Sequence, residues 1–339
     1  MKKSLCLLLI PAFFILYLSS CGNNSNECVY QPDISDIKIN IEIERLEGDL
    51  LSVESKTELR VFLKDNPVVT EIFLKRNQYP DDSIMMEALF KRFKNPHIDT
   101  LKSEIDRVFG DLSALKADIT TAFTNLKYYY PDFEAPKIQT VATGLDHDLF
   151  VSDSLIIIGL DYYLGDSAKY RPLGLYSYML ERYRPQYITP SIMLLYGISP
   201  MFNKTDVSDK TILADMIGYG KSFYFAKHMM PCTPDSVLIW YSNEEIEGAK
   251  ENQDIIWAHF LENQLLYETN HMVKKKYIDE RPKTFEIGEK APGRIATWLG
   301  WQIVRQYMEE NEGITMQGLM QEPNARKIFD DSGYRPERR

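Results

Sequence analysis

The spacing of apolar residues along the chain predicts a protein built mostly from helices. Between Leu101 and Leu126 an apolar residue recurs every three or four positions, which is the repeat of one helix face. Such a stripe can pack inside its own chain or, as a heptad seam, against a partner helix. Because Gly110 interrupts it and no longer heptad run follows, we favour packing inside the chain. Shorter helical patterns occupy residues 57–64, 68–76, 83–93, 208–227, 256–265 and 294–310, and a further helix is expected after an Asn243 cap.

Three segments have the pattern of strands instead. Isoleucines alternate with polar residues from Ile37 to Ile43, which indicates a strand with one buried face. Lys137–Val141 and the apolar run Leu155–Ile158 indicate two more, the second buried on both faces. Few strands among many helices predict an α+β fold, predominantly α-helical, with a small β-sheet.

The first residues have the features of an export signal. Lys2 and Lys3 precede an apolar run that is shorter than the roughly 20 residues of a membrane-spanning helix. The run ends in Leu18-Ser19-Ser20-Cys21, which resembles the lipobox of bacterial lipoproteins, proteins that are acylated on the cysteine and cut just before it. An ordinary signal with a chance cysteine is the alternative. We expect a lipoprotein signal peptide over 1–20, palmitate-type lipidation at Cys21, a lipidated, flexible polar tether over 21–35, and a single globular domain, as one body or two lobes, over 36–336.

Charge excludes one class of partner. The formal net charge is −10, and removal of Lys2 and Lys3 with the signal gives −12 (−10 minus 2). An acidic chain without a basic patch has no electrostatic attraction for nucleic acid, and anionic headgroups would repel it. The N-terminal lipid is therefore expected to hold the protein to the membrane, and other envelope proteins are the expected partners.

Two of the four cysteines remain for other chemistry. Cys6 lies in the signal and Cys21 is the expected lipid acceptor, which leaves Cys28 and Cys232 in a compartment that permits disulfides. Sequence does not show whether these two meet in space, so a Cys28–Cys232 bridge stays open.

Catalytic motifs are missing from the sequence. None of the five histidines belongs to an HExxH, HxxEH or HxH pattern, and there is no GxSxG, Walker loop or dinucleotide-binding glycine fingerprint. Asp146-His147-Asp148 is the densest group of ligand-type residues, but three neighbours face one ion only in a contorted loop. A solvated loop is therefore favoured, and we predict no catalytic residue, no metal site and no cofactor.

The segment Gly218-Tyr219-Gly220-Lys221 has the residue types of a phosphate-binding loop. It lacks the preceding strand and the spacing that such a loop requires. A helix that packs closely against its neighbours is the better interpretation.

Several stretches, in order, resemble one known family. From about Ile41 to Pro336 the chain is similar to the gliding-motility lipoprotein B (GldB) family of Bacteroidetes. Leu46 stands where the family's opening I-x-R-F-E-x-D has Phe, and Ala291 stands where Ser is usual; neither change removes chemistry. The stretches are 43–50 (IERLEGDL), 158–165 (IGLDYYLG) with Tyr170, 215–221 (DMIGYGK), Asn243-Glu244 with Ile256-Trp257, 291–304 (APGRIATWLGWQIV) and 332–336 (SGYRP).

The resemblance implies a lipoprotein of the cell envelope that is associated with the gliding-motility apparatus, which works alongside type IX secretion. The family also occurs in bacteria that do not glide. Residues 22–27 lack the acidic run associated with surface-exposed lipoproteins of this phylum. We therefore expect the periplasmic face of the outer membrane.

A weaker resemblance is to zinc-protease domains of gluzincin-like order, in which an HExxH helix precedes a helix that carries a Glu ligand. These helices would fall near Tyr187–Tyr196 and Leu213–Phe225, and 300–307 resembles the family's closing G-x-x-I-V-x-x-Y. The first stretch has no His or Glu, and Gly220-Lys221 stands in place of Glu-Gly. Zinc hydrolysis needs three protein ligands and a general base. The resemblance thus implies a zincin-like, pseudo-peptidase fold with a degenerate metal site.

Such a fold could keep a cleft for a peptide or another partner. The candidate lining residues are Tyr183, Lys221, Arg294 and Trp301, although a structural role is the favoured interpretation of each, in the core for Trp301 and at a salt-bridged helix start for Arg294. Together these observations predict a non-catalytic envelope component, accessory to gliding motility or type IX secretion, that acts by protein–protein contacts. The alternative is an envelope hydrolase, acting on peptides or peptidoglycan, with a site around Asp146, His147 and Asp148.

Overall fold

A computed structural model describes Cys28 and residues 31–336 of the chain. Cys21, the expected lipid acceptor, and the expected signal peptide over 1–20 lie outside the described residues. Within the part that is described, no helix has both the length and the apolar character that crossing a bilayer requires.

A four-stranded mixed sheet lies in the N-terminal half. Its strands are β1 (Ile43–Arg45), β2 (Lys137–Val141), β3 (Leu149–Val151) and β4 (Leu155–Gly159), in the order β1-β2-β4-β3. β2 pairs in parallel with both β1 and β4, whereas β3 runs antiparallel to β4. Because β4 has neighbours on both sides and is covered on both faces, Ile156, Ile157 and Ile158 are fully buried.

Two of the predicted strands are confirmed and one is shorter than predicted. β2 and β4 occupy the predicted segments, but only residues 43–45 of the alternating isoleucine segment pair with β2. Upstream of them the alternation keeps one face on the core, since Ile41 is buried, without a strand partner. β3 is an additional edge strand of three half-buried residues.

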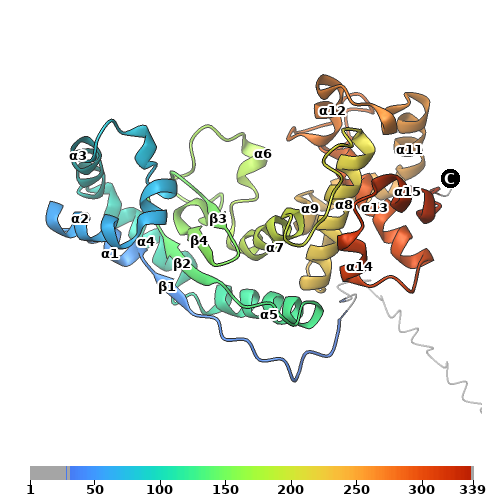
Figure 1. Cartoon of the computed structure of the whole chain (residues 1–339). Coiled ribbons are helices and arrows are strands. Elements are labelled where there is room, and N and C mark those ends of the chain that lie inside the picture. The colour runs from blue at the N-terminus through green and yellow to red at the C-terminus, as the bar shows by residue number, and fades with distance from the viewer. Residues whose placement is uncertain (1–27, 29–30, 337–339) are drawn as a thin grey trace, which may run out of the picture.

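The first helices of the N-terminal half lie around one end of the sheet, and the last of them extends from the sheet towards the C-terminal helices (Figure 1). The predicted helix over 68–76 is instead a π-helical turn, η1 (Val69–Phe73), and a 3-10 turn, η2 (Arg76–Gln78), because Lys75 has a left-handed backbone with φ 52°. The α-helices are α1 (Glu47–Leu51), α2 (Lys56–Asp65), α3 (Asp82–Phe93), α4 (His97–Phe109) and α5 (Ser113–Tyr129).

The long apolar stripe from Leu101 to Leu126 is divided between α4 and α5. The break lies at Gly110 and Leu112, which both have positive φ. Ile105 is 1% exposed and Leu126 is fully buried in the chain's own core. Packing inside the chain is therefore confirmed, and the stripe offers no seam for a partner helix.

The C-terminal half is helical and is organised around α8 (Ile212–Met229) and α13 (Ile295–Glu310) (Figure 1). Gly220 and Gly300 let these helices touch: a Cβ on Gly300 would lie 1.9 Å from the backbone oxygen of Met216. The close helix packing expected for Gly218–Lys221 is therefore present. The other elements are η3 (Leu160–Tyr163), α6 (Ser177–Leu180), η4 (Pro185–Tyr187), α7 (Ile188–Ile198), α9 (Asp235–Ile239), α10 (Asn243–Glu251), α11 (Gln253–Glu262), η5 (Leu265–Tyr267), α12 (His271–Ile278), α14 (Met316–Gln321) and α15 (Ala325–Ser332).

Two helix starts differ slightly from the prediction. Thr211, rather than Ser208 or Asp209, caps α8 by accepting from the backbone N–H of Ala214. Ser242, rather than Asn243, caps α10, since Glu245 completes a capping box with it. The overall prediction of an α+β fold, predominantly helical with a small sheet, is confirmed.

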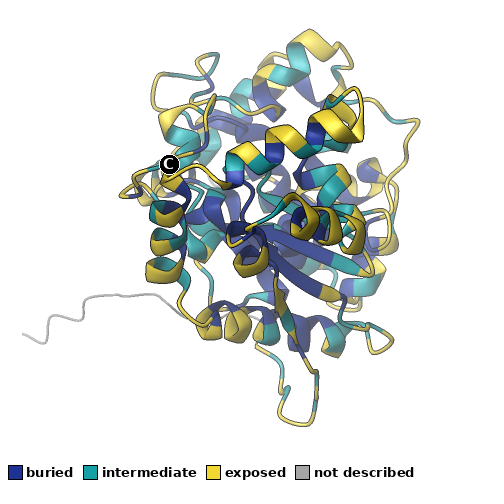
Figure 2. Ribbon diagram, turned by 90° about the vertical axis from the view of Figure 1, so that its left-hand side faces the viewer, coloured by how far each residue is buried: buried dark blue, intermediate teal, exposed yellow. Residues whose placement is uncertain are grey.

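The buried residues form one hydrophobic cluster that extends from Ile41 to Tyr334. Figure 2 shows the strands as largely buried and the surrounding helices as exposed on their outer faces. The core therefore links the sheet to the C-terminal helices.

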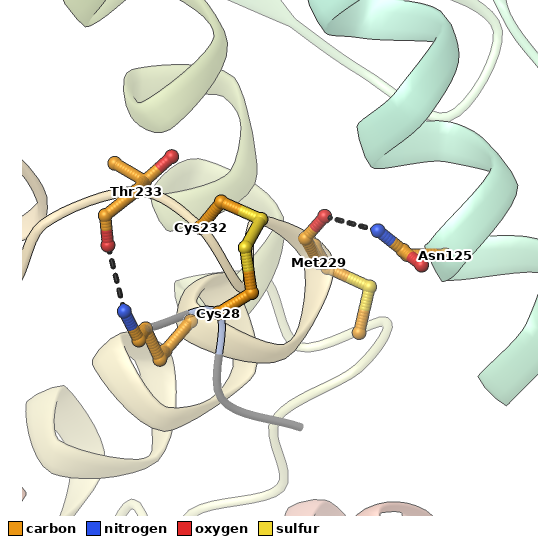
Figure 3. The surroundings of a disulfide bond; sticks show 6 residues. Cys28, Asn125, Met229, Cys232 and Thr233 are labelled. Atoms are coloured by element: carbon orange, nitrogen blue, oxygen red, sulfur yellow. Dashed lines mark hydrogen bonds between the residues drawn. A yellow bond between two sulfur atoms is a disulfide. The ribbon is translucent and has the colours of Figure 1, made fainter. Parts of the chain in front are cut away.

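Cys28 and Cys232 form a disulfide beside the end of α8 (Figure 3). Asn125 of α5 donates to the backbone oxygen of Met229 at 2.9 Å, and Lys227 donates to that of Thr233 at 2.7 Å, so the turn that carries Cys232 is held on both sides. The Cys28–Cys232 bridge, which the sequence left open, ties the chain to the body at position 28, within the expected tether over 21–35. From Gln31 the chain passes Tyr128 at the end of α5 and crosses to β1 (Figure 1).

Candidate functional site

Two adjacent pockets share a wall that is formed by Arg182 and Trp240, and we call the pair the Trp240 cleft. The first pocket has a volume of about 340 Å³ and is lined mostly by apolar side chains. The second has a volume of about 290 Å³ and is lined by charged and aromatic side chains. Residues of the cleft come from the segment between α6 and α7, from the end of α9 and from the segment before α13.

The backbone at the cleft adopts an uncommon conformation twice. Trp240 and Arg294 have φ of 61° and 57°, in the left-handed region that non-glycine residues rarely occupy. Each such residue costs on the order of 1–3 kcal/mol unless the surroundings enforce it. The Tyr241 hydroxyl donates to the backbone oxygen of Gly293 at 2.7 Å, which fastens the end of α9 to the start of α13. The surrounding fold therefore holds both side chains in the cleft although their backbone conformations are unfavourable.

Two guanidinium groups flank the Trp240 ring. Those of Arg182 and Arg294 lie 4.9 and 5.0 Å from its centroid, within cation–π range. Both contact a single carboxylate: Arg182 donates two bonds to Glu280 at 2.7 and 2.6 Å, and Nε of Arg294 lies 3.6 Å from it. Burial alone would raise the pKa of Glu280, but the hydrogen bond from Arg182 and the charges of both arginines lower it.

The other cations at the second pocket also have carboxylate partners. Lys283 lies 2.6 Å from Glu245, and Arg281 lies 3.0 Å from Glu286, which also lies 3.8 Å from Lys276. Arg182 and Arg294 share Glu280, so cations outnumber carboxylates among these contacts. Glu181 adds a negative charge at the exposed rim of the pocket.

Two N–H donors in the shared wall have no acceptor among the described residues. They are Nε of Arg182 and the indole Nε1 of Trp240, both covered from solvent. A buried donor without a partner costs about 1–3 kcal/mol. Such a group in a folded protein calls for an explanation, and a bound acceptor is one.

The first pocket has a polar edge formed by Asp148 and Tyr183. The Tyr183 hydroxyl donates to Oδ2 of Asp148 at 3.1 Å, and Nδ1 of His147 lies 3.4 Å from Oδ1. Burial would raise the pKa of Asp148, but hydrogen bonds from His147 and the Leu149 amide lower it below its ordinary value. Burial, followed by the nearby Asp148 charge, raises the pKa of Tyr183 well above its ordinary value.

The Asp146-His147-Asp148 segment does not converge on one point. Asp146 pairs with Arg92, the His147 ring packs on Phe73 with centroids 4.7 Å apart, and Asp148 faces Tyr183. Fully buried Asp161 fixes the preceding loop by accepting from the backbone N–H of residues 143–145. Within the described part of the chain, no group of three or more His, Cys, Asp or Glu residues is arranged to hold a metal ion.

A match to a protein-family model identifies the family of this chain. The family model described as gliding motility protein GldB matches residues 27–336. The chain belongs to the GldB family. Membership implies a gliding-motility-related lipoprotein of the cell envelope. No curated protein and no solved structure matches the chain, so the zincin-like fold remains a prediction.

The structure divides the four cleft residues expected in this GldB protein into two pairs. Tyr183 and Arg294 line the Trp240 cleft, from opposite pockets. Lys221 and Trp301 are only 1% and 0% exposed, and the Trp301 ring stacks on Phe223 in the core. As cleft-lining residues these two are wrong, because Trp301 packs on Phe223 in the core and Lys221 is buried against the backbone at Lys204 and Glu322.

Helices α7 and α8, which the gluzincin resemblance pairs as metal helices, pack directly on one another in this GldB protein. The Ser222 hydroxyl donates to the backbone oxygen of Leu194 at 3.0 Å. A Cβ on Gly197 would lie 2.9 Å from Cα of Ser222. At this contact the helices touch, which leaves no space for a metal ion and its water.

Nothing in the sequence of this GldB protein marks Arg182, Trp240 and Glu280 as one site. They lie about 40 to 100 positions apart and meet only after α9 and α13 have packed. The one available signal is the alternation of aromatic residues and arginines in Tyr176–Arg184, a composition that is enriched at interfaces.

Burial of Lys221 in this GldB protein predicts a specific pH dependence. Its ammonium donates to the backbone oxygens of Lys204 and Glu322, both at 2.8 Å. Burial lowers its pKa from 10.5 to about 8 in the folded protein. Between these values the unfolded chain binds more protons, so the free energy of unfolding rises with pH from about 8 to about 10, by up to roughly 1.4 kcal/mol per unit.

Urea unfolding across that pH range measures this slope. Lys221→Met should remove the rise whatever its effect on stability at neutral pH, whereas exposed Lys64→Met should keep it. An unchanged slope in Lys221→Met would show that Lys221 does not titrate in this window.

Proposed function

We propose that the protein is a lipid-anchored, non-catalytic component of the cell envelope, accessory to gliding motility or type IX secretion, which binds a partner protein at the Trp240 cleft. The observation that carries this proposal is the pairing of the charged groups at the cleft: Asp148 accepts a hydrogen bond from Tyr183, and Glu280 accepts two from Arg182. The pKa values of Asp148 and Glu280 lie below their ordinary values and that of Tyr183 lies above its own. General acid–base catalysis is most effective with a pKa near the working pH, so these groups are suited to binding rather than to proton transfer.

The contact between α7 and α8 gives further support. The two helices that the gluzincin resemblance pairs as metal helices touch each other at Ser222 and Gly197. Gly220, on α8, stands where that resemblance has the glutamate ligand, and the Lys221 cation follows it.

The anchor is proposed to be the lipid on Cys21, on the periplasmic side of the outer membrane. Cys28 follows it by seven positions (28 minus 21) and is bridged to Cys232. Seven extended residues span at most about 25 Å. The proposed anchor would thus keep the end of α8 within that distance of the lipid.

An envelope hydrolase is the second candidate, and one observation favours it. His147, Asp148 and Tyr183 form a chain of contacts at the edge of the apolar pocket, with distances of 3.4 and 3.1 Å. In that role His147 would act as the base and Asp148 would orient it, the relation between histidine and carboxylate in hydrolytic triads.

Two assays on purified protein separate the candidates. The parent protein should show no more peptidase or peptidoglycan-hydrolase activity than the His147→Ala variant. Calorimetric titration of the parent protein with zinc should show no stoichiometric binding. In parallel, the anchored protein should capture the same envelope partner with and without His147→Ala. Turnover that disappears in His147→Ala, or tight zinc binding at one ion per chain, would contradict the proposal.

A further inference from the structure

The apolar pocket of the Trp240 cleft leaves hydrophobic surface in contact with water at its rim. Leu195 and Ile198 of α7, three positions apart and thus neighbours on one helix face, are 43% and 47% exposed. Leu149 and Met179 line the interior. The volume of about 340 Å³ is at the small end of ligand pockets, which begin near 300 Å³, so it suits one large side chain better than an acyl chain.

The second pocket has the charge to receive a carboxylate. Arg182 and Arg294 share Glu280, whereas the other cations of the pocket, Arg281 and Lys283, already have carboxylate partners. A carboxylate supplies the missing negative charge, and arginine binds it with charge-assisted bonds.

The separation of the pockets limits the shape of the ligand. Arg182 and Trp240 line both pockets, so the two pockets meet at these side chains. The last residue of a polypeptide carries its side chain and its free carboxylate on the same Cα. We infer that the Trp240 cleft binds the C-terminal residue of a partner polypeptide, with a large apolar side chain in one pocket and the terminal carboxylate in the other. This inference rests on the proposed function and names the chemistry of its partner.

A labelled peptide tests the ligand chemistry. The probe is fluorescein-Gly-Ser-Gly-Ser-Phe with a free C-terminus, added to the full lipoprotein in lipid nanodiscs and followed by fluorescence anisotropy. Saturable binding is expected, and it should weaken at least about tenfold when the carboxylate is amidated or when the final Phe is Ala. Equal affinity of the amide, or stronger competition by decanoate than by unlabelled peptide, would overturn the inference.

Two matched variants test the location. Leu195→Asp puts a charge at the rim of the apolar pocket on a residue exposed enough to tolerate it, and binding should weaken at least about tenfold. Ile255→Asp, on a residue that is 57% exposed on another groove, should bind like the parent protein. Unchanged binding in Leu195→Asp would overturn the inference.

The inference and the proposed function fail in different ways. If no C-terminal peptide binds while the anchored protein still captures its partner, the cleft does not bind a C-terminal residue and the inference is wrong. The proposed function then stands. If peptide binds and is cleaved in a His147-dependent way, the C-terminal site is present but the non-catalytic function is wrong.

Discussion

Replacing Cys28 by serine is expected to lower the free energy of unfolding by about 2–5 kcal/mol. The Cys28–Cys232 bridge closes a loop with a sequence separation of 204. In the chain-entropy model a cross-link stabilises more as the loop lengthens, because it removes more freedom from the unfolded chain. For a loop of this size the model gives about 5 kcal/mol as an upper value.

The measurement is chemical unfolding of the chain from Gly22, exported behind a cleavable signal. Cys232→Ser and the double variant should match Cys28→Ser, since each removes the same bridge, and reduction should bring the parent chain to the same midpoint. A Cys28→Ser midpoint equal to that of the oxidised parent would show that the bridge does not stabilise the protein.

Gly300→Ala is expected to destabilise the protein by about 3 kcal/mol or more. The new Cβ would lie 1.9 Å from the backbone oxygen of Met216, and a Cβ on Gly220 of the facing helix would lie 2.4 Å from that of Gly300. Backbone atoms of a packed helix cannot turn aside as a flexible side chain can, so α8 and α13 would have to separate. Overpacking in a core costs typically about 1–3 kcal/mol, and here the largest helix interface of the fold is affected.

Gly248→Ala is the matched control for this change. Gly248 also lies inside a helix, α10, but nothing would lie within 4 Å of its Cβ. Its replacement should stabilise the protein by about 0.5–1 kcal/mol, because alanine favours the helix. If thermal unfolding shows the same shift for both variants, the α8–α13 contact is not the source of the effect.

The pattern of apolar residues was sufficient where it allows only one way to bury them. The uninterrupted apolar run of β4 and the alternation in β2 have one good solution in a sheet, and the stripe over α4 and α5 has one in the core. β3 was not predicted because it has only three residues, all half-buried, which are too few to show an alternation. The turn at Lys75 was not predicted because no sequence pattern indicates a left-handed backbone at a lysine.

Most of the candidate site could not be predicted, because its residues are brought together by tertiary packing and not by a sequence motif. Tyr183 and Arg294 were found through a family resemblance, but their neighbours Arg182, Trp240 and Glu280 become a unit only when distant helices pack. Lys221 and Trp301 were misplaced because sequence does not show which face of α8 or α13 is covered.

The central claim is that the protein acts by binding a partner at the Trp240 cleft. Complementation of a deletion strain tests this claim most directly. Each variant is expressed at the parent level with its anchor intact, and type IX secretion and envelope integrity are scored. His147→Ala and Tyr183→Phe should restore the parent phenotype, whereas Leu195→Asp should fail and Ile255→Asp should succeed. Failure of His147→Ala together with full restoration by Leu195→Asp would contradict the account.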